Sequence, residues 1–255
     1  MKKLNFKTLL LLMVCWASGL HSAVAQEMKP EETEDWSRKP EMVQLEGKNQ
    51  LPSDAIVLFS KNNLDQWHAE DGSAAKWKVK GSMFQVTPKT GLIITNNSFG
   101  DCQLHIEWNS PKEDVKAGLK SQGCGNSGIF LMGKYEVQVL NSYENETYYN
   151  GQASSIYKQH IPLVNASMKP GEWQSYDIIF TAPVFEGEGE TAKLVSPAYA
   201  TVLHNGVLVQ NHVELKGPTE YIGIPKYTWH PAKQPISLQD HGNRVSYRNI
   251  WIRNL

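Results

Sequence analysis

Cysteine is scarce in this sequence, and the familiar catalytic signatures are missing. Only three of the 255 residues are cysteine, and their spacing matches no metal-binding motif. The sequence contains no Gly-x-Ser-x-Gly, His-Glu-x-x-His or Gly-x-x-x-x-Gly-Lys-Ser/Thr, so it carries no motif of a serine hydrolase, a zinc protease or a P-loop protein. Function must therefore be inferred from the faces of the predicted strands.

Long hydrophobic runs are also missing, apart from a short one near the N-terminus. Leu9 to Trp16 follows three lysines and precedes Ala23-Val24-Ala25, a pattern that predicts a signal peptide over residues 1–25. The run is too short for a transmembrane helix. We therefore expect a mature bacterial protein that is periplasmic or secreted, with no membrane insertion after cleavage.

Neither sign of charge is in large excess. The chain has 25 Lys and Arg against 26 Asp and Glu, and without residues 1–25 the balance is 22 against 26. This balance argues against nucleic acid or an anionic membrane as a partner. The cysteines that remain after cleavage, Cys102 and Cys124, are compatible with either a disulfide or two buried thiols.

Alternating hydrophobic residues are what the sequence does contain. Leu104, Ile106 and Trp108 alternate with polar residues, which is typical of a strand with one buried face. Further strand-like runs cover residues 55–59, 135–139, 176–180, 236–239 and 245–252. There is no long amphipathic helical period and no internal repeat. We therefore predict an all-β fold, an antiparallel jelly-roll β-sandwich.

Turn signals and composition set the predicted boundaries. Asn205-Gly206 separates residues 201–204 from residues 207–209 and predicts a hairpin with a type I′ turn. Residues 26–52 are polar and acidic without an apolar period, so we expect a flexible lead-in there. The sandwich domain is then predicted to span residues 53–255.

Two long stretches interrupt the predicted strands. Residues 182–198 include the run Glu186-Gly187-Glu188-Gly189-Glu190 and are expected to form an exposed loop. Residues 141–172 are rich in Tyr, Asn and Gln, and loops of this kind often line binding sites. Tyr157 is our candidate substrate contact from this stretch.

The polar faces of two predicted strands hold the first candidate residues. His105 and Glu107 share one face of their strand, and Glu136 and Gln138 share one face of another. Carboxylate, amide and imidazole groups bind sugar hydroxyls, while aromatic rings cover the apolar faces of sugars. The simpler interpretation is that these side chains face solvent on an outer sheet surface.

A glycine-rich stretch leads into the Glu136 region. Residues 123–128 read Gly-Cys-Gly-Asn-Ser-Gly, and a predicted strand follows them. A phosphate-binding loop would need a helix there, so we favour a bulged strand start at which glycine permits close backbone approach. Asn126 and Ser127 would then project polar groups toward a ligand.

Residues 239–243, Gln-Asp-His-Gly-Asn, form the second cluster. Asp, Gly and Asn all favour turns, so the cluster could be no more than a turn. On the functional interpretation, His241 is a general base, Gln239 contacts substrate and Asp240 has a supporting role. The other histidines of the mature chain show no metal-ligand spacing and are expected to be surface or packing residues.

Short motifs occur in a characteristic order along residues 53–255. They are Ile56-Val57-Leu58-Phe59, Asn63-Leu64-Asp65-Gln66-Trp67, Leu104-His105-Ile106-Glu107-Trp108, Asn126-Ser127-Gly128-Ile129-Phe130-Leu131, Tyr135-Glu136-Val137-Gln138-Val139-Leu140, Pro170-Gly171-Glu172-Trp173, Leu238-Gln239-Asp240-His241-Gly242 and Arg248-Asn249-Ile250. In this order they resemble the 3-keto-disaccharide hydrolase domain family. The resemblance implies a concanavalin A-like sandwich and activity on glycosides already oxidised to a ketone at C3.

Two departures from the family pattern affect what can be transferred. His105 stands where the family often has Arg, and residues 141–169 form an expanded segment. Substrate details of relatives are therefore not carried over to this chain.

The resemblance also implies a mechanism. A C3 ketone acidifies the C2 hydrogen, so a base can form an enediolate, the C1 leaving group can depart and water can add back. His241 is the candidate base and Glu107 or Glu136 the candidate acid. The candidate substrate contacts are Asn126, Ser127, Gln138, Gln239, His105 and Tyr157. No residue is predicted to be a metal ligand, although a divalent cation could stabilise the enediolate.

Two other function classes fit the same residues. One is an ordinary glycosidase in which Glu107 and Glu136 are the paired carboxylates. The other is a non-catalytic carbohydrate-binding module, because the sandwich fold hosts both enzymes and binding proteins. All three readings share a carbohydrate as the ligand.

Overall fold

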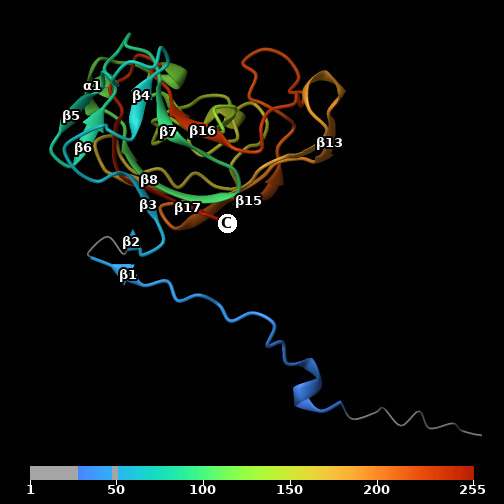
Figure 1. Ribbon diagram of the computed structural model, residues 1–255. Coiled ribbons are helices and arrows are strands. Elements are labelled where there is room, and N and C mark those ends of the chain that lie inside the picture. The colour runs from blue at the N-terminus through green and yellow to red at the C-terminus, as the bar shows by residue number, and fades with distance from the viewer. Residues whose placement is uncertain (1–27, 48–50) are drawn as a thin grey trace, which may run out of the picture. The chain divides into compact units, whose positions relative to one another are not determined.

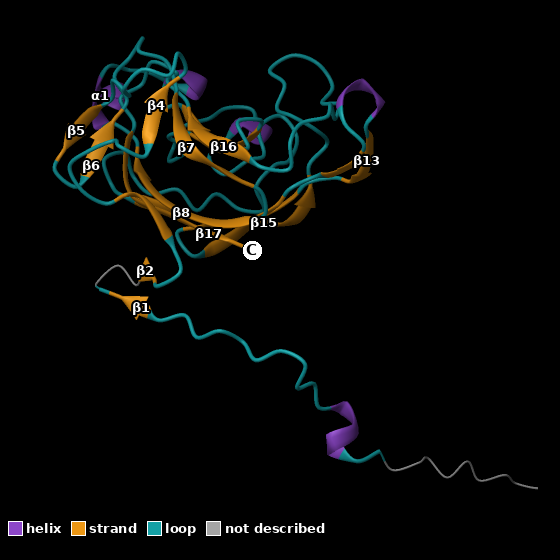
Figure 2. Cartoon of the chain, in the orientation of Figure 1, coloured by secondary structure: helices purple, strands orange, loops and turns teal. Residues whose placement is uncertain are grey.

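The computed structural model describes residues 28–47 and 51–255. The predicted signal peptide, residues 1–25, lies outside the described residues. The chain divides into two compact units, Met1–Met42 and Val43–Leu255. The described part of the first unit contains one short 3₁₀ helix, η1 (Pro30–Thr33). The second unit holds the described strands and is shown in Figures 1 and 2.

The larger sheet of the second unit has eight antiparallel strands. In spatial order they are β15 (Val207–Glu214), β14 (Tyr199–His204), β11 (Gln174–Thr181), β8 (Cys102–Asn109), β17 (Ser246–Asn254), β6 (Met83–Gln85) and β5 (Lys78–Lys80), and β3 (Ile56–Phe59) pairs with the later part of β17. This curved sheet forms the layer that includes β8, β17 and β15 in Figure 1.

The smaller sheet has five antiparallel strands. Their spatial order is β10 (Tyr135–Val139), β9 (Ser127–Leu131), β16 (Gln234–Leu238), β7 (Ile93–Phe99) and β4 (Trp67–Ala69). The remaining elements of this unit are short: β1 (Leu45–Glu46), β2 (Leu51–Pro52), β12 (Val184–Glu186), β13 (Lys193–Ser196), α1 (Lys112–Lys116), η2 (Ser121–Gly123), η3 (Tyr149–Gly151) and η4 (Gly189–Thr191).

The hydrophobic core lies between the two sheets. Leu104, Ile106 and Trp108 contribute to it from β8, and Tyr135, Val137 and Val139 contribute from β10. Successive strand residues point to opposite faces. Glu107 therefore projects from the outer face of the larger sheet, whereas Glu136 projects from the outer face of the smaller one.

A segment of the expanded region continues the smaller sheet beyond β10. Ile156 forms an isolated antiparallel bridge with Val137. The backbone N–H of Gln138 donates to the Ser155 carbonyl at 3.0 Å, and the N–H of Tyr157 donates to the Glu136 carbonyl at 3.1 Å. Residues 154–157 therefore run along the edge of β10 and bring Tyr157 next to Glu136.

The predicted fold class is confirmed: the described chain is an antiparallel β-sandwich with almost no helix. The predicted hairpin is present, because β14 and β15 flank Asn205 and Gly206, which both have positive φ angles. The expectation of a loop over residues 182–198 was wrong, since β12 and β13 pair there as a hairpin. Cys102 and Cys124 are both free and buried, so they form no disulfide.

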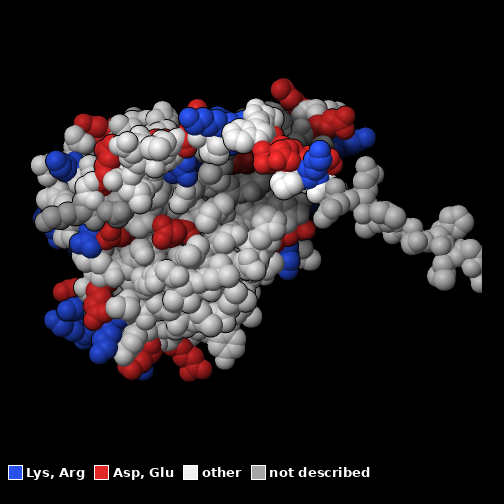
Figure 3. Space-filling view, turned by 90° about the horizontal axis from the view of Figure 1, so that it is seen from below, with Lys and Arg blue, Asp and Glu red and all other residues white. Residues whose placement is uncertain are grey.

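Two further features concern expected partners. Among the described residues, none belongs to a helix that is both long and apolar enough to cross a membrane. Figure 3 shows the second unit from below, and on its described surface Lys and Arg are interspersed with Asp and Glu rather than gathered into a patch of one sign.

Candidate functional site

A cavity of about 510 Å³ opens on the outer face of the smaller sheet. Its lining residues come from β9, β10, the end of β16 and three loops: Gln122, Asn126, Phe130, Glu136, Gln138, Tyr148, Tyr157, Thr219, Tyr221, Gln239 and His241. The volume lies in the ordinary range for small-molecule sites. The structure thus brings together six of the residues that the sequence proposed: Asn126, Glu136, Gln138, Tyr157, Gln239 and His241.

Glu136 is the buried carboxyl group of this cavity. Its residue is only 4% exposed, and burial raises the pKa of its side chain to about 8. No described Lys or Arg forms an ion pair with it within 4 Å. At neutral pH the group is therefore mostly a neutral acid that can donate a proton.

Gly128 makes room for this carboxyl group. It lies on β9, and an added Cβ there would overlap the Glu136 carboxylate and come within 2.7 Å of the Phe130 ring. Phe130 and Glu136 are direct cross-strand partners. The sequence suggested a close approach at this glycine-rich stretch. At Gly128 the approaching groups are the side chains of Glu136 and Phe130, and no phosphate is needed to explain the glycine.

Amide side chains surround Glu136. The Asn126 amide donates to the Gln122 carbonyl at 2.8 Å and to Gln122 Oε1 at 3.2 Å. The Gln138 amide contacts Gln122 Oε1 at 3.0 Å. If the Gln138 amide is turned over, its nitrogen donates to Glu136 Oε1 at 3.1 Å and to the Ser127 carbonyl at 2.9 Å. Gln138 can therefore face either a neutral or an ionised Glu136, because an amide presents a donor and an acceptor.

His241 is an exposed residue at the cavity, and Asp240 fixes the turn that carries it. Asp240 Oδ2 accepts from the backbone N–H groups of Thr90 at 3.0 Å and Gly91 at 3.2 Å. Its Oδ1 accepts from the N–H of Gly242 at 2.9 Å. Asp240 thus has the supporting role that the sequence suggested, while the imidazole next to it is free to meet a ligand.

Ser127 does not line the cavity. Its side chain is fully buried, donates to the Gln239 carbonyl at 2.6 Å and accepts from the Tyr247 hydroxyl at 2.7 Å. It therefore links β9, the end of β16 and β17 within the sandwich. The expectation that Ser127 would project toward a ligand is not met, because strand alternation directs it to the core side.

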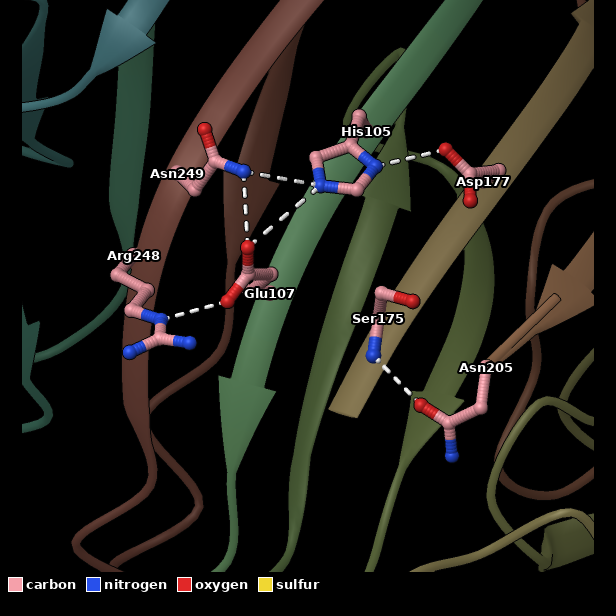
Figure 4. A network of polar contacts seen from close by, with 7 residues as sticks. All are labelled: His105, Glu107, Ser175, Asp177, Asn205, Arg248 and Asn249. Carbon is pink, nitrogen blue, oxygen red and sulfur yellow. Dashed lines mark hydrogen bonds and ion pairs between the residues drawn. The ribbon is translucent and has the colours of Figure 1, made fainter. Parts of the chain in front are cut away.

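His105 and Glu107 lie on the opposite side of the sandwich, in the polar network of Figure 4. His105 Nδ1 is 2.7 Å from Asp177 Oδ1, and the Glu107 carboxylate meets Arg248 Nε at 2.5 Å and Asn249 Nδ2 at 2.8 Å. Every polar partner of Glu107 in this network belongs to β8 or β17. The structure therefore does not bring His105 or Glu107 to the cavity of Glu136.

Charges in this network stabilise one another. Burial lowers the pKa of His105, but hydrogen bonds and charges from Asp177 and Glu107 outweigh it and raise the pKa to about 9. Burial raises the pKa of Glu107, but hydrogen bonds from His105, Asn249 and Arg248, together with the Arg248 charge, lower it to about 2. These are the properties of a structural ion network that holds β8, β11 and β17 together.

Five lining residues were not predicted from the sequence: Gln122, Phe130, Tyr148, Thr219 and Tyr221. Two had a usable signal, since Phe130 is two residues from Gly128 on the same strand face and Tyr148 lies in the Tyr-rich stretch. Thr219 and Tyr221 belong to an irregular loop with no periodicity that could have indicated them.

Within residues 28–47 and 51–255, no group of three or more His, Cys, Asp or Glu residues is arranged to hold a metal ion. The cavity itself offers one carboxyl group, one imidazole and several amide oxygens.

Fold and site together define an antiparallel β-sandwich with a polar, aromatic-lined cavity on one sheet. Residues 54–253 match the family model of the 3-keto-alpha-glucoside-1,2-lyase-like domain. The chain therefore belongs to this family, which confirms the resemblance suggested by its motifs.

Individual relatives agree with this assignment. A 3-keto-disaccharide hydrolase of Bacteroides thetaiotaomicron is 23% identical, and the match covers 81% of each chain. A crystal structure from Parabacteroides distasonis ATCC 8503, described as a "putative glycosyl hydrolase", is 46% identical with a TM-score of 0.83 and covers 89% of this chain and 97% of its own. A second structure with the same description and source is 16% identical, has a TM-score of 0.55 and shares the fold.

Proposed function

We propose that this protein cleaves 3-keto-glycosides by proton abstraction at C2, elimination at C1 and addition of water. The observation that carries the proposal is the Glu136 carboxyl group, which is buried in a sugar-sized polar cavity and has a pKa of about 8. Family membership and hydrolase-like relatives support a glycoside-cleaving enzyme. The same proposal places the mature protein in the periplasm or outside the cell, following its predicted signal peptide.

In the proposed reaction, His241 takes the proton from C2 of the ketone-bearing ring. The electron pair left on C2 is delocalised onto the C3 oxygen as an enediolate. It then forms the C1–C2 double bond as the C1–O bond breaks, and Glu136 gives its proton to the departing oxygen. Water then adds across the double bond, with its oxygen on C1 and a proton on C2, so the net change is hydrolysis.

Amide groups around the cavity have a positioning role in this scheme. Gln138 and Asn126 are buried and held through Gln122, so little conformational entropy is lost when they orient sugar hydroxyls. A divalent cation near the C3 oxygen would assist enediolate formation, with the cavity's amide oxygens as its donors.

The structure does not favour the paired-carboxylate glycosidase. That mechanism needs its two carboxyl groups within ~10 Å on one substrate. Glu107 and Glu136 project from opposite outer faces of the sandwich, with the hydrophobic core between their strands. The cavity contains a single carboxylic acid. One acid suffices for elimination from a sugar that a C3 ketone already activates, whereas displacement at C1 of an unoxidised sugar needs a second carboxylate.

The substrate experiment compares a 3-keto-glucoside with its parent glucoside, each with and without a chelator. We expect release of the leaving group from the keto form only. Equal cleavage of the parent glucoside would contradict the proposal, and binding of either compound without turnover would favour a non-catalytic module. Loss of activity with chelator, restored by added divalent cation, would establish the cation.

A further inference from the structure

The cavity is lined by two kinds of side chain. The first are the carboxyl, amide and imidazole groups described above. The second are Tyr148, Tyr157 and Tyr221, which cluster around Lys158 and which we call the tyrosine wall. None of these three residues takes part in the proton transfers of the proposed mechanism, and Tyr157 is so far named only as a substrate contact.

Two rings of the tyrosine wall are fixed to one another. The rings of Tyr148 and Tyr157 meet edge to face with centroids 6.2 Å apart, and their hydroxyl oxygens are 2.5 Å apart. Tyr157 is held against the edge of β10 by its backbone. Gly151 is needed behind Tyr148, because any Cβ there would overlap the Tyr148 ring.

Lys158 joins all three rings. Its ammonium nitrogen lies 4.1 Å from the centroid of Tyr148, 5.9 Å from Tyr157 and 5.6 Å from Tyr221. Lys158 has φ of 62°, the left-handed region that non-glycine residues rarely occupy. Such a conformation persists when its surroundings hold it in place. Here the cation–π contacts with the tyrosine wall stabilise it.

Tyr221 is carried by an anchored loop with an apolar tip. Thr219 donates its N–H to the Lys134 carbonyl at 2.8 Å and accepts from the N–H of Glu136 at 2.9 Å. Beyond this anchor, Tyr221 is 71% exposed, Ile222 81% and Ile224 91%. The apolar surface of the tip therefore continues from the cavity at Tyr221 into solvent.

We propose that the tyrosine wall is the leaving-group subsite and that it takes a flat aromatic aglycone rather than a second sugar. A second hexose has several hydroxyls that need hydrogen-bond partners when they leave water. The hydroxyls of Tyr148 and Tyr157 hydrogen-bond to each other, which leaves a single O–H donor between them for a ligand, and the adjoining tip offers isoleucine side chains. Aromatic ring faces and apolar surface suit an aromatic ring. This inference rests on the proposed function, because it assigns the other half of the same substrate.

The kinetic experiment uses the 3-keto forms of phenyl α-glucoside and of an α-linked glucose disaccharide. Tyr221→Ala should lower the aryl-to-disaccharide ratio of kcat/KM about tenfold, the loss expected for one stacking partner. The intrinsic difference between the two leaving groups cancels when the ratio of the variant is compared with the ratio of the wild type. Tyr149→Ala is the matched control, since Tyr149 is 63% exposed and does not line the cavity. An unchanged ratio, or a larger loss for the disaccharide, would overturn the inference.

A binding experiment separates this inference from the proposed function. Calorimetry with unoxidised phenyl α-glucoside and maltose needs no turnover, so it remains decisive if no keto-glycoside is cleaved. We expect tighter binding of the phenyl glucoside, weakened about tenfold in Tyr221→Ala and unchanged in Tyr149→Ala. Equal or tighter binding of maltose would assign the wall to a sugar ring. A dimer mass in light scattering that is lost in Tyr221→Ala would show that the apolar tip binds a second copy of the chain. Either result contradicts an aglycone subsite.

Discussion

Burial of Glu136 raises its pKa, which suits a general acid but lowers the free energy of unfolding at neutral pH. Its pKa is about 8 in the folded chain and near 4.5 when exposed to water. Between these values the folded state binds more protons than the unfolded state, so the free energy of unfolding falls as pH rises, by at most about 1.4 kcal/mol per pH unit. Above pH 8 both states are ionised and this dependence ends.

Glu136→Gln should therefore separate activity from stability. We expect turnover of a 3-keto-glucoside to fall ~10²–10⁴-fold, since the general acid is gone. Thermal melts should show the variant more stable than the wild type at pH 8 and closest to it at pH 5. Glu172→Gln serves as the control because Glu172 is exposed and should change neither property. A variant that melts below the wild type at pH 8 would contradict the buried neutral acid.

His241→Ala tests the proposed base. Turnover should fall ~10²–10⁴-fold, while the circular dichroism spectrum and melting temperature stay close to wild type because His241 is exposed. His212→Ala is the matched control, an exposed histidine on β15 of the other sheet. Unchanged activity in His241→Ala would remove this residue from catalysis.

At the scale of elements, β9 and β10 act as a pair that builds the floor of the cavity. Gly128 on β9 lies beside Glu136 on β10, so the shape of one strand sets the position of the acid on the other. The same pair buries Ile129 and Val137 on its core side. Changes on the outer face can therefore alter the site without removing core packing.

Gly128→Ala tests this separation. The added methyl group overlaps the Glu136 carboxylate and must displace it, so we expect kcat to fall at least ~10-fold, as for a misplaced catalytic group. The sheet should survive, because any residue tolerates the strand conformation at this position. The kcat of Gly206→Ala, in the distant β14–β15 turn, provides the control for activity, whereas its melting temperature should fall because Gly206 has a positive φ angle. Wild-type kcat in Gly128→Ala would show that Glu136 tolerates movement.

The elements also show what the sequence could and could not predict. Alternation located β8 and β10 and identified the polar faces that carry Glu107 and Glu136. Alternation is the same for a strand of either sheet, so it could not reveal that these carboxyl groups lie on opposite sides. Tyr221 was missed for a different reason: loop residues depend on tertiary anchors such as Thr219, which have no local signature.

For the whole molecule, three perturbed groups combine into one pH profile of stability. Glu107, with its pKa lowered to about 2, contributes stability that is lost as pH falls below about 4.5 toward 2. His105, with its pKa raised to about 9, contributes stability that is lost as pH rises from about 6.5 through 9. Glu136 lowers the free energy of unfolding further as pH rises from about 4.5 to 8.

The melting temperature should therefore be highest near pH 4.5 and decline toward both pH 3 and pH 9. Thermal melts at constant ionic strength from pH 3 to 9 provide the measurement. In Glu136→Gln the decline between pH 5 and 8 should become shallower, and what remains should reflect His105. A melting temperature that rises from pH 6 to 9 would contradict the assigned directions.

The strand-like segment 154–157 also bears on solubility. The open edge of a sheet presents unpaired N–H and C=O groups that can recruit another chain. Here the N–H and C=O groups of β10 are covered by Ser155 and Tyr157 of the same chain, so the insertion that shapes the cavity also protects the sheet from intermolecular pairing. Shortening this insertion to alter specificity would expose that edge, and aggregation would then accompany any change in substrate preference.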